Sequence, residues 1–264
     1  MLRKFRMLVT GLGAAGALLL PVMAMAADEK PKLDTGDTAW MLTSTALVLM
    51  MTIPGLALFY GGMVRKKNVL ATVMQSFAIT CLVTVLWMVL TYSLAFTSGS
   101  TIIGGLSRIF LKGMALDSVH ELAKTIPESV YMTYQMTFAI ITPALISGAV
   151  VERMHFGAWL AFLLLWTCLI YFPLAHMVWG PAGFLGPEGM GALDFAGGLV
   201  VEMASGMAAL VAAVVVGRRR HYPQSISPPH NVPFILLGAG LLWAGWFGFN
   251  GGSGLVAGNL ASLA

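Results

Sequence analysis

The sequence predicts an all-α, polytopic membrane protein, and three observations support this fold class. Of the 264 residues, 58% are hydrophobic and only 10% are charged. The mean hydropathy is +0.84. Soluble globular domains carry about 25% charged residues, so the low charge excludes that class. The third observation is the length of the apolar runs, because a helix needs roughly 20 predominantly apolar residues to cross a bilayer.

The first 26 residues resemble a cleaved secretory signal peptide. Basic residues near the start precede an apolar run from Leu8 to Leu20, and Ala24-Met25-Ala26 supplies the small residues expected before a cleavage site. The apolar run is shorter than a membrane span, which disfavours a retained first helix. We therefore expect a domain at 27–264 whose mature amino terminus lies outside the membrane.

Six further apolar runs are long enough to span the bilayer. They cover residues 38–63, 69–97, 128–150, 156–179, 194–217 and 232–258. With the amino terminus outside, the inner loops hold most of the basic residues between spans, as the positive-inside rule requires. These residues are Arg65, Lys66, Lys67, Arg153, Arg218, Arg219 and Arg220. We expect a multi-pass protein of the cell inner (plasma) membrane.

Two carboxylates, Asp194 and Glu202, lie at the start of the fifth predicted span and inside it. A charged side chain near the bilayer centre costs at least about 2.5–3.5 kcal/mol, so such residues usually face a bundle interior or a solvated path. Asp194 can accept hydrogen bonds from the first helical turn, or its charge can favour an arriving cation. Glu202 follows about 12 Å further along the helix. A polar route through a membrane bundle is therefore predicted.

Other classes of function are disfavoured by the residue pattern. The basic residues form short clusters without interleaved aromatic residues, so we expect no nucleic-acid binding. No histidine has a Cys or His partner at metal-ligand spacing, so no metal and no cofactor are expected. A nucleophile, a base and an orienting group do not occur together, so an enzyme is not expected. The adjacent charges of Glu152 and Arg153 lie at the end of the third predicted span, so we expect them to form a neutralising pair or a helix cap.

Five segments carry a more specific signal. They are MTIPGLALFYGGMVRKKNVL (51–70), ALISGAVVERMHF (144–156), PLAHMVWG (173–180), GALDFAGGLVV (191–201) and GWFGFNGGSGLVAGN (245–259). One Gly-rich apolar string would be weak, because such strings are common in packed membrane helices. Together, in this order and spacing, the segments resemble the ammonium transporter family (Amt, Mep and Rh proteins) from about residue 36 onward. The resemblance implies a helical bundle of two inverted halves, of which this chain would supply the first half, five spans, and the first span of the second.

The resemblance also implies a path for ammonium, with an outer recruitment site, an aromatic gate and an apolar lumen. By position, the recruitment site would comprise Phe138, Trp179 and Ser253. Phe138 and Phe249 would form the gate, with Tyr134 as a further aromatic residue. Aromatic faces attract a cation by about 0.5–2 kcal/mol, and a hydroxyl oxygen accepts a hydrogen bond from an N–H group. The simpler alternatives are packing, an interfacial tryptophan and a small residue that permits close helix approach.

The two carboxylates differ in how they match the family. Asp194 lies in the family's ALDFAGG motif, where we favour the structural role with an indirect electrostatic effect on the site. Glu202 departs from the pattern, because its position usually holds the first of two lumen histidines, and the replacement resembles one seen in some fungal members. We hypothesise that Glu202 accepts or relays a proton from ammonium. The alternative is a protonated glutamate hydrogen-bonded to a neighbouring helix.

The resemblance implies inward transport of ammonium or ammonia across the plasma membrane by a homotrimer. An ammonium sensor is the alternative class of function. A PII-type regulatory protein is a further implied partner, and the arginine-rich loop 217–230 is a candidate contact, although a topological role explains it more simply. The second departure is length, because family members have about eleven spans. A fragment of a longer gene product, or a truncated chain that does not conduct, is therefore expected.

Overall fold

The computed structural model describes residues 32–219, 222–225 and 227–264. The chain divides into two units, Met1–Leu33 and Asp34–Ala264, and the second unit contains all the elements discussed below. The expected signal peptide lies outside the described residues. Within the second unit nearly all regular structure is helical, and one two-stranded sheet pairs β1 (Val119–His120) with β2 (Ala123–Pro127) in antiparallel fashion.

Six helices in the described part of the chain are long and apolar enough to cross a membrane, which confirms the predicted fold class. The first joins α2 (Thr35–Met50) through the π-helical turn η1 (Met51–Leu56) to α3 (Ala57–Met63). The second joins α4 (Val69–Leu86) through η3 (Trp87–Thr91) to α5 (Tyr92–Phe96). The third is α6 (Glu128–Val150), and the fourth joins α7 (Phe156–Trp166) through η5 (Thr167–Tyr171) to α8 (Phe172–Trp179). The fifth is η6 (Gly198–Met203) with α9 (Ala204–Val216), and the sixth is α10 (Val232–Gly252), followed by the short α11 (Asn259–Leu263).

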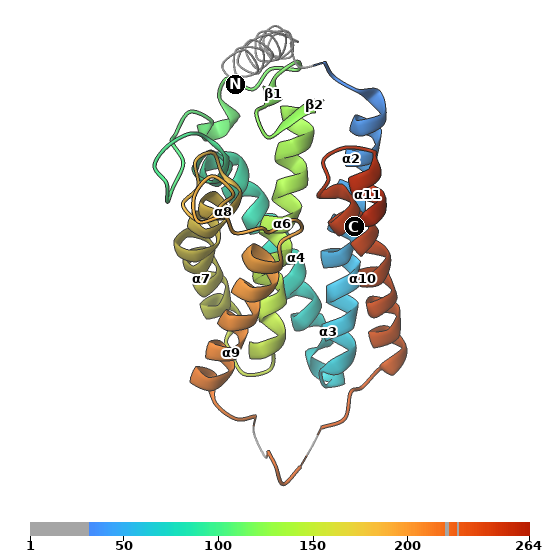
Figure 1. Cartoon of the computed structure of the whole chain (residues 1–264). Coiled ribbons are helices and arrows are strands. Elements are labelled where there is room, and N and C mark those ends of the chain that lie inside the picture. Colours follow the sequence, from blue (N-terminus) through green and yellow to red (C-terminus); the bar gives the residue numbers. More distant parts are fainter. Residues whose placement is uncertain (1–31, 220–221, 226) are drawn as a thin grey trace, which may run out of the picture. The chain divides into compact units, whose positions relative to one another are not determined.

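The third helix, α6, is the centre of the bundle (Figure 1). It contacts α2, α4 and α9. In its most apolar stretch of 18 residues 67% of the residues are buried, whereas the buried share is 22–39% in the other spans. Its buried aromatic residues include Tyr131, Tyr134 and Phe138. A helix surrounded on most sides by other helices presents its side chains to the protein interior, so α6 is the element best placed to line an internal path.

The first and sixth helices pack closely through glycines. A Cβ atom at Gly238 would lie 2.4 Å from the backbone nitrogen of Phe59, and one at Gly62 would lie 2.6 Å from the carbonyl oxygen of Asn231. Small residues of this kind let the backbones of membrane helices approach each other. The first helix also bends within η1, where Ile53 leaves the helical conformation (φ −131°, ψ 113°) before Pro54, because proline disrupts the backbone hydrogen bonding of a helix.

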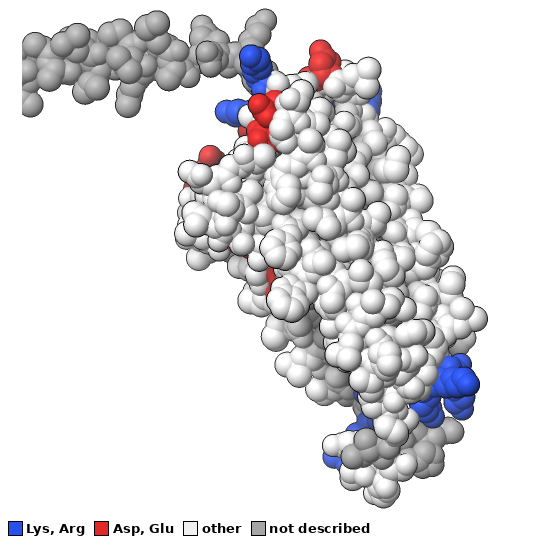
Figure 2. Space-filling model, turned by 90° about the vertical axis from the view of Figure 1, so that its right-hand side faces the viewer, with Lys and Arg blue, Asp and Glu red and all other residues white. Residues whose placement is uncertain are grey.

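On the face that Figure 2 shows, charged side chains gather toward the two ends of the bundle, and a broad band that is almost free of charge separates them. We call one end the basic end. It carries the loops after α3, α6 and α9 with Arg65, Lys66, Lys67, Arg153, Arg218 and Arg219. We call the other end the hairpin end, because it carries segment 97–127 with β1 and β2. An uncharged band between polar ends is what a bilayer requires of a spanning bundle.

A buried carboxylate ties the loops of the basic end together. Glu152 accepts hydrogen bonds from Asn68 Nδ2 (2.6 Å), from the backbone N and the Nε of Arg65 (3.0 and 3.1 Å), and from Arg219 Nη1 (3.3 Å). Its neighbour Arg153 instead donates to the backbone carbonyls of Ala149 and Gly217. The predicted neutralising pair is wrong, because Glu152 binds residues of other loops. The alternative prediction, a helix cap, holds for Arg153, because it donates to the carbonyl of Ala149 in the last turn of α6.

Two helix ends differ from the predicted spans by more than three residues. The fifth helix begins at Gly198 rather than at 194, and the sixth ends at Gly252 rather than at 258. In both places the Gly-rich, apolar sequence extends beyond the helix as a turn. Hydropathy identifies the apolar stretch, but the hydrogen-bonded turns at its ends decide where the helix stops.

Candidate functional site

A cavity of about 210 Å³ lies toward the hairpin end, and its walls contain Phe138, Trp179 and Ser253. We call it the outer pocket. The three side chains come from α6, the end of α8 and the end of α10, so residues far apart in sequence converge on one space. The ring centroids of Phe138 and Trp179 are 6.0 Å apart, and the two planes are nearly perpendicular at 89°. The remaining lining residues are Leu122, Tyr131, Tyr134, Gln135, Asp194, Phe195 and Leu255.

Asp194 organises one wall of the outer pocket through the backbone. One oxygen of its carboxylate accepts from Gly197 N (2.6 Å), and the other accepts from Leu199 N and Val200 N (2.9 Å each). These N–H groups stand at the start of the fifth helix, where no intrahelical partner exists and negative charge complements the helix dipole. The carbonyl oxygen of Asp194 accepts from Trp179 Nε1 at 2.8 Å. Asp194 therefore starts the helix and fixes the indole ring.

Ser253 offers an acceptor to the outer pocket. Its Oγ lies 2.8 Å from the carbonyl oxygen of Phe249 and donates to it. Tyr134 OH, on a ring that is only 1% exposed, lies 2.9 Å from the same carbonyl and 3.3 Å from Ser253 Oγ. Because the single hydroxyl proton of Ser253 points at Phe249, its oxygen keeps lone pairs for an N–H donor.

Phe138 and Phe249 form the boundary below the outer pocket. Their ring centroids are 4.3 Å apart at an interplanar angle of 34°, and each side chain is 2% exposed. Phe138 lines the outer pocket, whereas Phe249 lines a second cavity of about 340 Å³. The residues expected to form the gate therefore lie between two cavities.

The second cavity, which we call the inner cavity, is almost entirely apolar. Its walls include Met51, Leu56, Leu145 and Trp246, and its polar groups are Glu202 and Tyr60. Tyr60 OH already donates to the carbonyl oxygen of Leu145 at 2.9 Å. Among the described residues, no hydrogen bond joins the Glu202 carboxylate to a neighbouring helix. Glu202 thus supplies the one carboxylate on the wall of this cavity.

Two more cavities help to define the site. A wider one of about 520 Å³ shares Leu122 and Trp179 with the outer pocket, so it forms a vestibule in front of the pocket. Its charged lining residues are Glu121, Glu188 and Lys124. Another of about 500 Å³, between α7 and α9, is lined almost entirely by apolar side chains and has neither a carboxylate nor a hydroxyl group on its wall. Within the described residues, no group of three or more His, Cys, Asp or Glu side chains is arranged to hold a metal ion.

The sequence did not single out every residue that shapes the outer pocket. Leu122 enters from the hairpin, and Tyr131 and Gln135 extend the α6 wall. The sequence did contain a signal for Tyr131 and Gln135. Each lies three positions before a predicted site residue, Tyr134 or Phe138, and residues at this spacing share one face of a helix. Nothing in the local pattern around Leu122 places it beside α8 and α10.

The sequence and the fold are similar to those of known proteins. A family model described as "Ammonium Transporter Family" matches residues 39–264. The chain belongs to this family. An ammonium transporter from Bacillus subtilis (strain 168) is 51% identical over 229 residues, covering 87% of this chain and 55% of the relative.

Solved structures agree with the family assignment. The crystal structure of Candida albicans Mep2 is 37% identical with a TM-score of 0.77, covering 89% of this chain and 51% of that chain. A structure named "Sensor Amt Protein" is 28% identical with a TM-score of 0.75, covering 86% and 57%. This ammonium transporter family member spans about half the length of the curated relatives it matches.

Proposed function

We propose that this family member moves ammonium or ammonia across the plasma membrane and recruits the cation in the outer pocket. The observation that carries the proposal is the convergence of two aromatic faces and a free hydroxyl acceptor, from Phe138, Trp179 and Ser253, above an aromatic pair that separates two cavities. The match to the ammonium transporter family supports the same substrate.

The chemistry of the pocket suits a weakly hydrated monovalent cation. Each aromatic face attracts a positive charge by about 0.5–2 kcal/mol, and Ser253 Oγ accepts one N–H. A calcium ion needs six to eight oxygen ligands, and magnesium keeps a tight octahedral shell. The pocket cannot replace such shells, because the oxygens of Asp194 already accept from backbone N–H groups, and Ser253 and Gln135 add too few further oxygens. An ion with several N–H donors and a diffuse charge is the better match.

Glu202 is the proton acceptor in this proposal. After the cation passes Phe138 and Phe249, it enters a cavity with few polar groups, where a bare ammonium ion is costly. Transfer of one proton from ammonium to the Glu202 carboxylate leaves neutral ammonia and a neutral carboxylic acid. Neutral ammonia crosses an apolar lumen at lower cost, and the acid then releases its proton.

The proposal includes an orientation and an assembly. The hairpin end faces outward and the basic end faces the cytoplasm, which agrees with the positive-inside rule. Residues 1–26 serve as the signal peptide, and the protein lies in the cell inner membrane. A homotrimer and a PII-type regulatory protein at the loop 217–230 complete the proposal, and both rest on the family resemblance.

The test of the function is uptake of labelled methylammonium by cells that lack other ammonium carriers. Trp179→Leu removes an aromatic face from the outer pocket and should raise KM about 2- to 30-fold, the range that 0.5–2 kcal/mol of cation–π attraction gives. Trp243→Leu is the matched control, because that indole is 75% exposed on α10 and lies outside the pocket. Absence of saturable uptake, or equal KM values for the two variants, would contradict the proposal. Binding without accumulation would favour the sensor alternative.

Glu202→Gln tests the proton step separately. Gln keeps the size of the side chain but takes up no proton in the range of transport assays, so we expect uptake that is slower and has a changed dependence on pH. Asp117→Asn, an exposed change on the segment 97–127, is the control and should leave the profile of the wild type. If Glu202→Gln keeps the wild-type pH profile, Glu202 does not relay the proton.

A further inference from the structure

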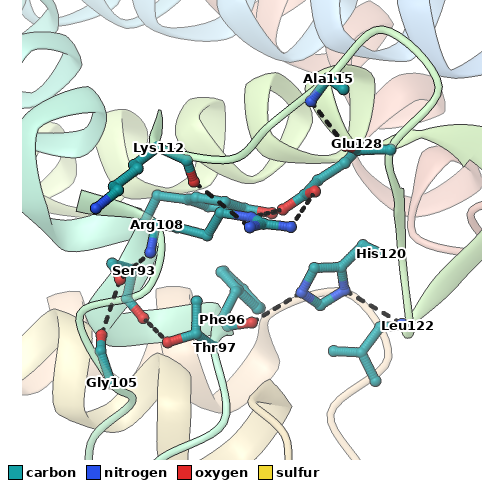
Figure 3. Close-up of polar contacts among 12 residues, drawn as sticks. Ser93, Phe96, Thr97, Gly105, Arg108, Lys112, Ala115, His120, Leu122 and Glu128 are labelled. Carbon is teal, nitrogen blue, oxygen red and sulfur yellow. Dashed lines mark hydrogen bonds and ion pairs between the residues drawn. The ribbon is translucent and has the colours of Figure 1, made fainter. Parts of the chain in front are cut away.

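His120 lies in the hairpin beside the outer pocket, and its ring makes two hydrogen bonds of opposite kind (Figure 3). Nε2 lies 2.8 Å from the carbonyl oxygen of Phe96, and Nδ1 lies 3.2 Å from the backbone nitrogen of Leu122. A carbonyl oxygen only accepts and a backbone N–H only donates. The ring must therefore be neutral, with its proton on Nε2 and a lone pair on Nδ1.

The same ring contacts two walls of the outer pocket. His120 stacks on Tyr131 with centroids 4.5 Å apart and an interplanar angle of 21°. Tyr131 and Leu122 both line the outer pocket together with Trp179, and Leu122 also lines the vestibule. His120 is itself outside the pocket and only 7% exposed. It is placed to act on the pocket through its neighbours rather than by touching the cation.

We propose that His120 is a proton-sensitive positioning residue of the outer pocket. The neutral ring holds Leu122 in the pocket wall, and a second proton on the ring releases Leu122 and weakens cation binding. The part that concerns cation binding rests on the proposed function. In the proposed orientation, the proton comes from the outside of the cell.

The response follows from the hydrogen-bond geometry. A proton on Nδ1 points at the N–H of Leu122, so two donors face each other and the bond between them is lost. The contact with Tyr131 survives, because an aromatic face attracts a cation. Among the described residues, the Leu122 N–H has no other hydrogen-bond acceptor. The change is therefore concentrated at Leu122, on the wall shared by the outer pocket and the vestibule.

The charged groups around His120 come from several elements. Glu128, at the start of α6, accepts from Arg108 Nε (2.8 Å) and Nη2 (3.0 Å) and from Tyr92 OH (3.1 Å), so its charge is largely neutralised. Glu121 follows His120 in the hairpin. The tyrosines Tyr92 and Tyr131 complete the surroundings, with the Tyr92 ring 6.4 Å from that of His120.

The sign of the pH effect follows from these surroundings. Burial lowers the pKa of His120 below its usual value, although the Phe96 carbonyl, Glu128 and Glu121 act in the opposite direction and Arg108 adds to the lowering. The His120 ring therefore binds a second proton less tightly in the folded hairpin than in the unfolded chain. The stability that the neutral ring gives the hairpin is complete above the ordinary histidine pKa of about 6.5, and it is lost as the pH falls through the lowered pKa of His120. Acid conditions release Leu122.

The first arm of the test is amide hydrogen exchange of residues 119–126, corrected for the intrinsic pH dependence of exchange. Between pH 7.5 and pH 4.5, a range that extends well below the ordinary histidine pKa, we expect the wild-type protein to lose protection about fivefold, which corresponds to a hydrogen bond worth about 1 kcal/mol. His120→Asn should lose none, because the Asn oxygen can accept from the N–H two residues on and does not titrate. His155→Asn removes an exposed histidine at the basic end and should behave like the wild type.

The second arm is KM for methylammonium at the same two external pH values. We expect KM to rise severalfold at pH 4.5 in the wild type and in His155→Asn, and to stay constant in His120→Asn. Wild-type protection that does not change with pH overturns the proposal. Loss of protection with a constant KM overturns the link to the pocket. Absence of uptake in every variant contradicts the proposed function instead, and the exchange arm then decides alone whether His120 releases Leu122.

Discussion

At the scale of single residues, the outer pocket depends on backbone groups that hold its side chains in place. Trp179 is fixed by the carbonyl of Asp194, and Ser253 is fixed by the carbonyl of Phe249. These hydrogen bonds hold the ring and the hydroxyl in one orientation, so the pocket is formed without a ligand. Preorganisation of this kind lowers the entropy lost on binding.

Asp194 is the residue whose loss should disturb this arrangement most. In Asp194→Asn one acceptor oxygen becomes an NH₂ group that faces backbone N–H donors, so we expect a loss of about 2 kcal/mol of stability and a raised KM. The thermal midpoint of the detergent-solubilised protein measures the first effect.

Asp34→Asn is the matched control for this change. Asp34 caps the start of α2 by accepting from Asp37 N at 2.8 Å, and Asn caps helices equally well. Its midpoint should stay at the wild-type value. Equal midpoints for Asp194→Asn and the wild type would show that the three N–H contacts do not stabilise the fold.

Sequence reasoning reached some of these residues but not their partners. Phe138, Trp179 and Ser253 were predicted together from the family motifs, and the structure places them on one pocket. The hydroxyl of Tyr134 beside Ser253 was not predicted, because an aromatic residue in a span indicates packing as readily as polar contact. The approach of Leu122 depends on how a loop folds back over the bundle, and no local pattern records that.

At the scale of elements, the loops at each end are held by a buried carboxylate. At the hairpin end Glu128, 2% exposed, binds Arg108 through two nitrogens and so attaches segment 97–127 to α6. At the basic end Glu152 joins the loops after α3 and α9. A bidentate guanidinium pair gives such an attachment a defined geometry.

The Glu152 carboxylate, which with its hydrogen-bond partners we call the clamp, should be charged at neutral pH. Burial is the largest single influence and raises its pKa, but the bonds from Asn68 and Arg65 together outweigh burial and hold the pKa below the ordinary value of 4.5. Because the pKa is lower in the folded protein, the clamp stabilises the loops at neutral pH. That contribution is lost as the pH falls through the lowered pKa.

Glu152→Gln should therefore loosen the loop after α9. Gln cannot form the ion pairs with Arg65 and Arg219, so we expect trypsin at neutral pH to cleave near Arg218 several-fold faster than in the wild type. Glu188→Gln, in a loop at the hairpin end, is the control and should leave the cleavage rate unchanged. Equal rates for both variants would mean that Glu152 does not restrain this loop.

The scale of the whole molecule is where the sequence predicted most. Low charge and six long apolar runs require a spanning bundle, because no soluble fold tolerates them and the bilayer demands continuous helices. The exposed faces of α9 and α10 carry large apolar residues such as Val214, Trp243 and Phe247, as contact within a membrane requires. The ends and bends of spans were less predictable, because turn hydrogen bonds set them rather than hydropathy.

At this scale the central claim is that two cavities on either side of an aromatic pair form one path. The outer pocket and the inner cavity meet at Phe138 and Phe249, and the vestibule opens onto the outer pocket at Trp179. On the proposed path, a cation meets the charged groups of the vestibule first, then two rings and a hydroxyl, and then an apolar space with Glu202. In the proposal, this is also the order in which ammonium loses its water and then its proton.

The most direct measurement is a pair of high-resolution structures, one in an ammonium salt and one in the matching sodium salt. The account predicts a density peak in ammonium alone, within about 3 Å of Ser253 Oγ and between the rings of Phe138 and Trp179. A pocket with no peak in ammonium, or an equal peak in sodium, would contradict it.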